Sequence, residues 1–260
     1  MDCEKILYEE LRPEEFLERV NARPIAYLPL GTLEWHGMHL PLGSDGIQSR
    51  GVFEALAKKI GGVVLPMLFL GPDPVSDGSG SEFYGMDAIS FEAGRPQQLV
   101  GSAYHIDDDL FASLLDTICK NLSRAGFKVV VGHGHGPSTS AFAKNKEKLE
   151  GKYGLLLFNL WELGFAGDEG IQTDHAAANE TSLVMALRPD LADISRIADD
   201  CPPVGVSGKD PRLHSSESDG RRIIQKNVDV VSKKLTHIME KYPVGDKIIK
   251  YDGVKNLIRG

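Results

Sequence analysis

Two short segments of the chain combine histidine with carboxylate side chains at spacings that suit a metal site. In the first, Glu34 and His36 stand two residues apart, just after the apolar run 25–30. If the backbone stays extended, this spacing points both side chains to one face. Asp45 follows a loop rich in glycine and proline, and its carboxylate could bridge two ions. The alternative is a turn whose acids cap backbone N–H groups, with His36 as a core residue.

The second segment is a glycine-rich loop that carries two histidines. Residues 127–131 are predicted to form a buried strand, and this strand runs directly into Gly-His-Gly-His-Gly-Pro. His133 and His135 could again project to one side, while the glycines would let a ligand approach the backbone closely. Packing in an apolar core is a poor explanation for histidines that are flanked by glycine at the end of a buried strand. A glycine-rich turn with exposed imidazole rings is the alternative.

A third group of chemically capable residues lies at the expected start of a helix that continues through Leu187. Asp174 and His175 precede this helix, and Glu180 follows five residues after the histidine. An acid, a histidine and a second acid at a helix entrance could transfer protons and orient neighbouring groups. Simple capping of the helix is the alternative.

The apolar pattern predicts the elements that must position these residues. Expected strands alternate with expected helices along the chain, which favours right-handed crossovers and an α/β fold with a mainly parallel sheet covered by helices on both faces. In such sheets the ligand crevice lies beyond the carboxyl ends of the strands. Both histidine-bearing loops follow strands. The expected strands are 25–30, 63–70, 127–131 and 154–161, and the expected helices are 13–20, 46–60, 107–122, 138–153 and 220–241.

Residues 71–104 show no clear hydrophobic period and are dense in glycine, proline, aspartate and serine. A connection of this length inside a compact domain is usually functional. We therefore predict a loop that covers the substrate or contacts another subunit, in preference to a small extra sheet.

Composition restricts the class of protein. A chain of 260 residues with 42% apolar content can bury a large core, and we favour one domain over residues 1–260. The net charge of −8 and the lack of a basic cluster argue against nucleic acid as a partner and favour a small-molecule substrate. The chain has neither a signal-peptide pattern nor an apolar run of membrane-spanning length, so we expect a soluble cytoplasmic protein.

The segment 30–45, Leu-Gly-Thr-Leu-Glu-Trp-His-Gly-Met-His-Leu-Pro-Leu-Gly-Ser-Asp, resembles the opening signature of the creatininase (creatinine amidohydrolase) family. That signature is Gly-x-x-Glu-x-His-Gly-x-His-Leu-Pro-x-x-x-Asp. Gly132-His133, the segment 175–182 and Gly-Val-Ser-Gly at 205–208 are similar to later landmarks of the family. The resemblance extends over most of the chain.

The resemblance implies a three-layer α/β/α fold, an assembly that is often a hexamer, and a site with two divalent metal ions. Zinc is the first expectation, with manganese or iron as alternatives. By this resemblance Glu34 and His133 hold one ion, His36 holds the other, and Asp45 bridges them. His135 stands where creatinine hydrolases have a metal-binding glutamate, so either His135 or Glu180 would complete the second metal shell.

The implied activity is hydrolysis of a small cyclic or formylated amide at a non-peptide C–N bond, by a hydroxide bridged between the two metals. His175 would give a proton to the leaving group, with Asp174 or Glu180 orienting it. Two alternatives remain open. One is a hydrolase that opens an oxidised cyclic polyol of keto-inositol type at a C–C bond, and the other is a non-catalytic, metal-dependent binding protein.

Overall fold

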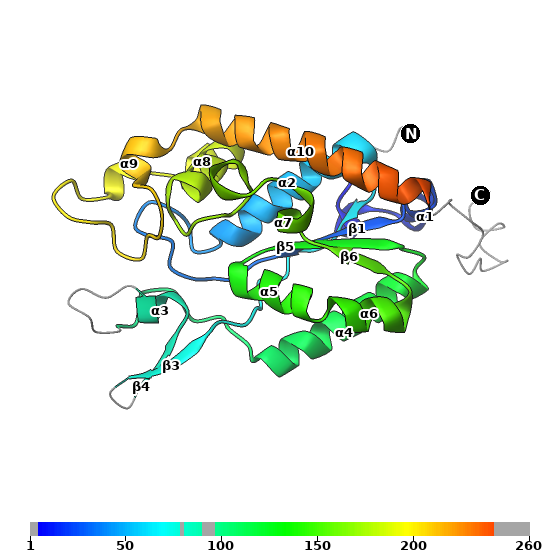
Figure 1. Cartoon of the computed structure of the whole chain (residues 1–260), viewed down its shortest axis with the longest axis horizontal. Helices are drawn as coiled ribbons and strands as arrows, with labels where there is room; N and C mark the ends of the chain where they lie inside the picture. The colour runs from blue at the N-terminus through cyan, green and yellow to red at the C-terminus, as the bar shows by residue number, and fades with distance from the viewer. Residues whose placement is uncertain (1–4, 79–80, 90–96, 242–260) are drawn as a thin grey trace.

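A four-stranded parallel sheet forms the centre of the molecule, with strand order β2-β1-β5-β6 (Figure 1). The computed structural model describes residues 5–78, 81–89 and 97–241. The strands are β1 (Ile25–Leu30), β2 (Val63–Val64), β5 (Val129–Gly134) and β6 (Leu156–Phe158). This arrangement confirms the predicted α/β class with a parallel central sheet.

Helices cover both faces of this sheet and produce three layers (Figure 1). One layer contains α2 (Ser44–Ile60), α7 (Leu160–Leu163), α8 (Ala178–Leu187) and the long α10 (Glu217–Glu240). The opposite layer contains α4 (Asp108–Arg124), α5 (Gly136–Lys144) and α6 (Lys146–Tyr153). Helix α1 (Pro13–Ala22) packs beside β2, and the short helix α9 (Pro211–His214) contacts α8.

Alternate residues of the central strands face the two layers, as the pleat of a strand requires. Ile25 and Tyr27 of β1 join the apolar cluster formed with α2 and α10, whereas Ala26 and Leu28 join the cluster formed with α4, α5 and α6. All six residues of β1 are buried, which is typical of a strand covered on both sides. The sheet therefore separates two cores.

Strand β5 is longer than predicted and contains the first histidine of the glycine-rich segment. It ends at Gly134, which pairs with Leu30 at the end of β1. Gly134 has φ of +151°, and a Cβ atom there would lie 1.4 Å from the carbonyl oxygen of Leu30. Only glycine fits this position. The chain turns there, and His135 becomes the residue that precedes α5.

The segment 71–104 contains a small antiparallel sheet, contrary to the prediction of a loop. Strands β3 (Val75–Gly78) and β4 (Ser81–Tyr84) pair with each other, and the short helix α3 (Met86–Ile89) follows. This unit projects at the lower left of Figure 1, and its described strands form no ladder with the main sheet. Residues 79–80 and 90–96 of the segment lie outside the described residues.

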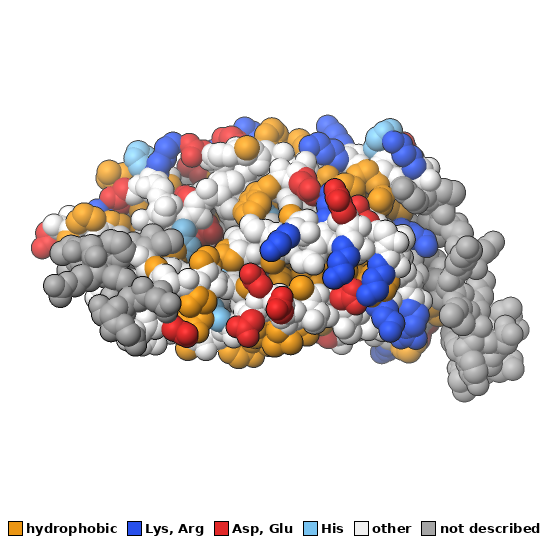
Figure 2. Space-filling model, turned by 60° about the horizontal axis from the view of Figure 1, so that its bottom comes forward, with side chains coloured by type: hydrophobic (Ala, Val, Ile, Leu, Met, Phe, Trp, Pro, Cys, Tyr) orange, Lys and Arg blue, Asp and Glu red, His pale blue; other side chains and the backbone are white. Residues whose placement is uncertain are grey.

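Three other predicted elements differ from expectation. The strand predicted over 63–70 is limited to the two residues of β2, Val63–Val64. The helix predicted over 138–153 is divided into two helices, α5 and α6, with Asn145 between them. The apolar run 154–161 forms only the three residues of β6, because Asn159 and Glu162 make a capping box that starts α7. Within the described ranges, none of the helices combines the length and apolarity needed to cross a bilayer. Acidic and basic side chains are interspersed over the face seen in Figure 2.

Candidate active site

The candidate site lies where β1 and β5 end side by side. The chain leaving β1 supplies Glu34 and His36, and the chain leaving β5 supplies His135. Asp45 comes from the first turn of α2 and Glu180 from the first turn of α8. All five side chains are buried. Segments that are distant in the sequence therefore meet at the carboxyl edge of the sheet, as predicted for this class of fold.

Three overlapping groups, two of which add Asp73 or His175 to these side chains, could each hold a metal ion. Within each group the candidate ligand atoms lie within 4.8 Å of one another. The groups, found among the described residues, are His36 with Asp45 and Glu180; Glu34 with Asp73 and His135; and Glu34 with His36 and His175.

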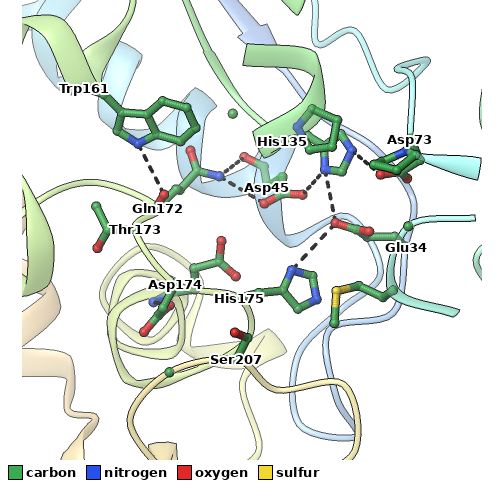
Figure 3. A pocket seen from close by; sticks show the side chains of 18 of the residues that line it. Glu34, Asp45, Asp73, His135, Trp161, Gln172, Thr173, Asp174, His175 and Ser207 are labelled. Atoms are coloured by element: carbon green, nitrogen blue, oxygen red, sulfur yellow. Dashed lines mark hydrogen bonds and ion pairs between the residues drawn. The ribbon is translucent and has the colours of Figure 1, made fainter. Parts of the chain in front are cut away.

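Asp45 connects two of the histidines. Its Oδ2 lies 3.2 Å from Nδ1 of His135 (Figure 3). Its Oδ1 lies 3.5 Å from Nε2 of His36. Glu34 approaches the same nitrogen of His135 at 3.1 Å. One carboxylate thus faces two neighbouring ligand groups, which is the geometry expected of a bridging residue.

The electrostatics of this cluster are unusual for a protein interior. Burial opposes protonation of His36, but the adjacent Asp45 and Glu180 carboxylates outweigh it and raise the pKa of His36 to about 10. Burial, followed by the charge of Asp45, raises the pKa of Glu180. For Asp45 burial acts upward, yet His36 and His135 hold its pKa well below the usual range. The carboxylates of the cluster therefore favour positive charge on the neighbouring side chains.

The residues present fit divalent metal ions. Glu34, Asp45, Asp73 and Glu180 together carry four carboxylates in the three groups. Nε2 of His36 is buried and has no hydrogen-bond partner among the described residues. Imidazole nitrogen and carboxylate oxygen are the donors preferred by zinc and manganese.

His133 lies outside the three metal-capable groups found among the described residues, whereas Glu34 and His135 share one of them. The ring of His133 packs edge-on against Trp161 at 5.0 Å between ring centroids, and its Nε2 lies 3.3 Å from the carbonyl oxygen of Ile171. Burial lowers the pKa of His133 to about 4. The reason is the turn at Gly134: His133 keeps the strand alternation and faces α7, whereas His135 turns toward Glu34.

His175 lies at the wall of the site, next to His36. The two rings are 4.4 Å apart, and Nε2 of His175 donates to the carbonyl oxygen of Trp35 at 2.8 Å. Its other nitrogen, Nδ1, lies 3.8 Å from Glu34. The side chain is 18% exposed, more than those of Glu34 and His36. Burial, followed by the charge of His36, lowers the pKa of His175.

Asp174 and Glu180 form hydrogen bonds with groups other than His175. Asp174 accepts hydrogen bonds from the backbone N–H groups of Asn179 and Glu180 and so caps α8. Glu180 accepts from the N–H of Ala176 and faces His36 at 3.5 Å. Nε2 of His175 has the carbonyl of Trp35 as its hydrogen-bond partner. The orienting role expected for either acid stays a prediction.

Two residues near the site were not predicted from the sequence. Asp73 stands between two prolines just after the second apolar run, and its position shortly after a predicted strand was the available signal. Gln172 has φ of +54° and donates from Nε2 to Oδ1 of Asp45 at 3.2 Å. No local pattern predicts that contact, because it joins residues 127 positions apart.

A cavity of about 1050 Å³ opens onto the cluster (Figure 3). Glu34, Asp45 and His135 form its polar floor, together with His175 and Glu180. Apolar and aromatic side chains contribute to its walls, namely Pro74, Met86, Pro137, Trp161 and Phe165. The combination of apolar walls and convergent polar groups is typical of a small-molecule site.

The fold and the site together define a three-layer α/β protein with a histidine–carboxylate cluster of metal-binding type. The model of the creatininase family, described as creatinine amidohydrolase, matches residues 9–233. The chain belongs to this family, which is a family of metal-dependent hydrolases. The chain is 30% identical over 226 residues to a creatinine amidohydrolase of Pseudomonas putida, covering 78% of this chain and 81% of that protein.

Solved structures show the same fold. The structure described as "Creatininase Mn" matches with a TM-score of 0.66 and 22% identity, over 92% of this chain and 99% of that one. A mutant creatininase described as "Zn-Zn type" matches with a TM-score of 0.65 and 22% identity, with the same coverage.

Proposed function

We propose that this protein hydrolyses a non-peptide C–N bond in a small cyclic or formylated amide, using two divalent metal ions. The observation that carries the proposal is the position of Asp45 between His36 and His135 at the floor of the cavity. The similarity to a creatinine amidohydrolase supports the reaction class and makes creatinine the first substrate to test.

We further propose that one ion is held by His36, Asp45 and Glu180, and the other by Glu34, His135 and the same Asp45. The first set is one of the three groups of close ligand atoms. In the second set, Asp45 takes the place of Asp73 because its Oδ2 lies 3.2 Å from Nδ1 of His135. His135 replaces His133 in this assignment. Zinc and manganese are the metals to test first, since related structures are described by those metals. When bound, such ions would supply Lewis acidity toward a carbonyl and lower the pKa of a water molecule.

The protein's own side chains would supply substrate binding and proton transfer. The apolar walls around Trp161 and Phe165 exclude water from one side of a small ring. His175, with Nε2–H donated to Trp35, keeps Nδ1 free to accept a proton from water and pass it to the leaving nitrogen. The C–N bond breaks, a C–O bond forms, and the proton ends on the nitrogen.

The test is a substrate panel assayed with the protein loaded with zinc or manganese. We expect turnover of creatinine or of another small cyclic amide or formamide, and its loss in His36→Ala and Asp45→Ala. Turnover confined to keto-inositols would favour C–C bond cleavage at the same site. If the protein binds metal but turns over none of these compounds, the binding-protein alternative is favoured.

We also propose a homo-oligomeric assembly, with a hexamer expected from the family resemblance. Light scattering coupled to size-exclusion chromatography tests this directly. A mass near 28.4 kDa, that of one chain, would contradict it.

A further inference from the structure

The carboxylate of Asp73 joins two histidines at the edge of the candidate site. Its Oδ1 lies 3.0 Å from Nε2 of His135, within hydrogen-bond distance (Figure 3). Its Oδ2 lies 3.1 Å from Nδ1 of His105. The side chain of Asp73 is 2% exposed and that of His105 is 9% exposed. A buried carboxylate between two imidazole rings requires neighbouring residues that hold all three groups in position.

Several features hold this carboxylate in place. Pro72 and Pro74 flank Asp73, so both neighbouring φ angles are fixed and Asp73 itself is biased toward an extended conformation. Gly85 has φ of +51°, and a Cβ atom there would lie 2.8 Å from Cγ of Asp73. Its N–H donates to the carbonyl of Pro74 at 2.9 Å. The backbone therefore closes over the carboxylate on one side.

His105 is itself held by an aromatic contact. Its ring stacks on Tyr84 with 5.4 Å between centroids and 7° between the ring planes. Tyr84 is the last residue of β4. The small sheet of β3 and β4 thus supports His105, which contacts Asp73.

The two nitrogens of His135 face different partners. Nε2 faces Asp73, whereas Nδ1 faces Glu34 at 3.1 Å and Asp45 at 3.2 Å. A histidine binds metal through an unprotonated nitrogen, and its other N–H is normally donated to a carboxylate or carbonyl. With Nε2–H donated to Asp73, the lone pair of Nδ1 points toward the two acids that face the cavity.

We propose that Asp73 is a positioning residue that orients His135 for metal binding through Nδ1, and that His105 fixes the orientation of Asp73. This inference rests on the proposed function, because it takes Glu34, Asp45 and His135 as one metal site. It also assigns a role to the β3–β4 unit, which supplies the contacts that hold the carboxylate.

The test measures metal affinity of the metal-free protein by competition with a chromophoric zinc chelator. Asp73→Asn removes the charge with little change in shape. We expect it to bind two ions, one of them about 10- to 100-fold more weakly than the wild type does. His105→Asn should weaken the same ion by a smaller, measurable factor. Asp190→Asn, which removes a carboxylate paired with Arg188 on the surface, is the matched control and should bind as the wild type does.

A cobalt-loaded sample distinguishes positioning from direct ligation. If Asp73 only orients His135, the visible absorption bands of Co²⁺ in Asp73→Asn keep the wild-type shape. A changed spectrum with loss of one ion would overturn the proposal in favour of Asp73 as a ligand.

Unchanged metal affinity in both Asp73→Asn and His105→Asn would overturn the proposal while the proposed function stands. A wild-type protein that binds no divalent ion would overturn both. If Asp73→Asn does not fold, the His105→Asn variant provides the test. Wild-type metal affinity in that variant would contradict the proposal that His105 acts on His135 through Asp73.

Discussion

Asp45 stands between His36 and His135, with one carboxylate oxygen 3.5 Å from the first histidine and the other 3.2 Å from the second. These three residues come from the loop after β1, the first turn of α2 and the turn after β5. A single carboxylate thus faces one potential metal-binding histidine through each of its oxygens. The two-metal proposal rests on this relationship.

The two histidines of the glycine-rich segment should behave differently when each is replaced. His135→Ala should lower metal content, because Nδ1 of His135 faces Glu34 and Asp45. His133→Ala should keep the metal content and lower thermal stability, because its buried ring packs on Trp161. Elemental analysis and thermal unfolding of both variants check this. Loss of metal in His133→Ala alone would show that the assignment is reversed.

Gly134→Ala should prevent or strongly impair folding. An added Cβ atom would lie 1.4 Å from the carbonyl oxygen of Leu30, and φ of +151° is strained for any other residue. We expect a loss of about 3 kcal/mol or more in the free energy of unfolding. Gly136→Ala is the matched control, since no heavy atom lies within 4 Å of its added Cβ. Denaturant unfolding compares the two, and equal stability would refute the steric argument.

His175→Asn should reduce kcat by about 10²- to 10⁴-fold, the range typical of a lost proton-transfer group. Metal content should not change, because the two proposed metal sites are formed without this residue. Steady-state kinetics on the best substrate of the panel, with parallel elemental analysis, provide the measurement. A variant that loses an ion would identify His175 as a ligand through its group with Glu34 and His36.

The surface ion pairs of Glu169 should make stability depend on pH below neutrality. Arg222, followed by Lys226, lowers the pKa of Glu169 to about 2. A lowered carboxyl pKa stabilises the fold above the unfolded pKa of about 4.3 and loses that effect as pH falls through about 2. Wild type should therefore exceed Glu169→Gln in stability at pH 7, with the difference shrinking between pH 4 and pH 2. Glu147→Gln on α6 is the control. A stability difference between wild type and Glu169→Gln that grows as the pH falls would contradict the predicted direction.

Much of the fold could be predicted because its signals are local. Residues Ile25–Leu30 form the predicted strand with the predicted bounds, since an unbroken apolar run matches a strand buried on both faces. The location of the site also followed, because parallel strands bring their carboxyl ends to one edge. Glu34, His36, Asp45 and His135 meet there.

The remaining features depend on contacts between distant segments. The choice between His133 and His135 depends on the turn at Gly134, which is imposed by the Leu30 carbonyl of a neighbouring strand. Asp73 meets His135 across 62 positions of sequence. The spacing of residues within a loop contains no information on either relationship. The loop prediction for 71–104 failed similarly, since β3 and β4 are short strands without an apolar alternation.

The most direct test of the central claim is the metal stoichiometry of the wild type and of Asp45→Ala, measured by elemental analysis after equilibration with zinc. The shared position of Asp45 predicts two ions per chain in the wild type, and loss of both, together with turnover, in a folded Asp45→Ala protein. Two ions retained in Asp45→Ala, or none in the wild type, would contradict a site organised around this carboxylate.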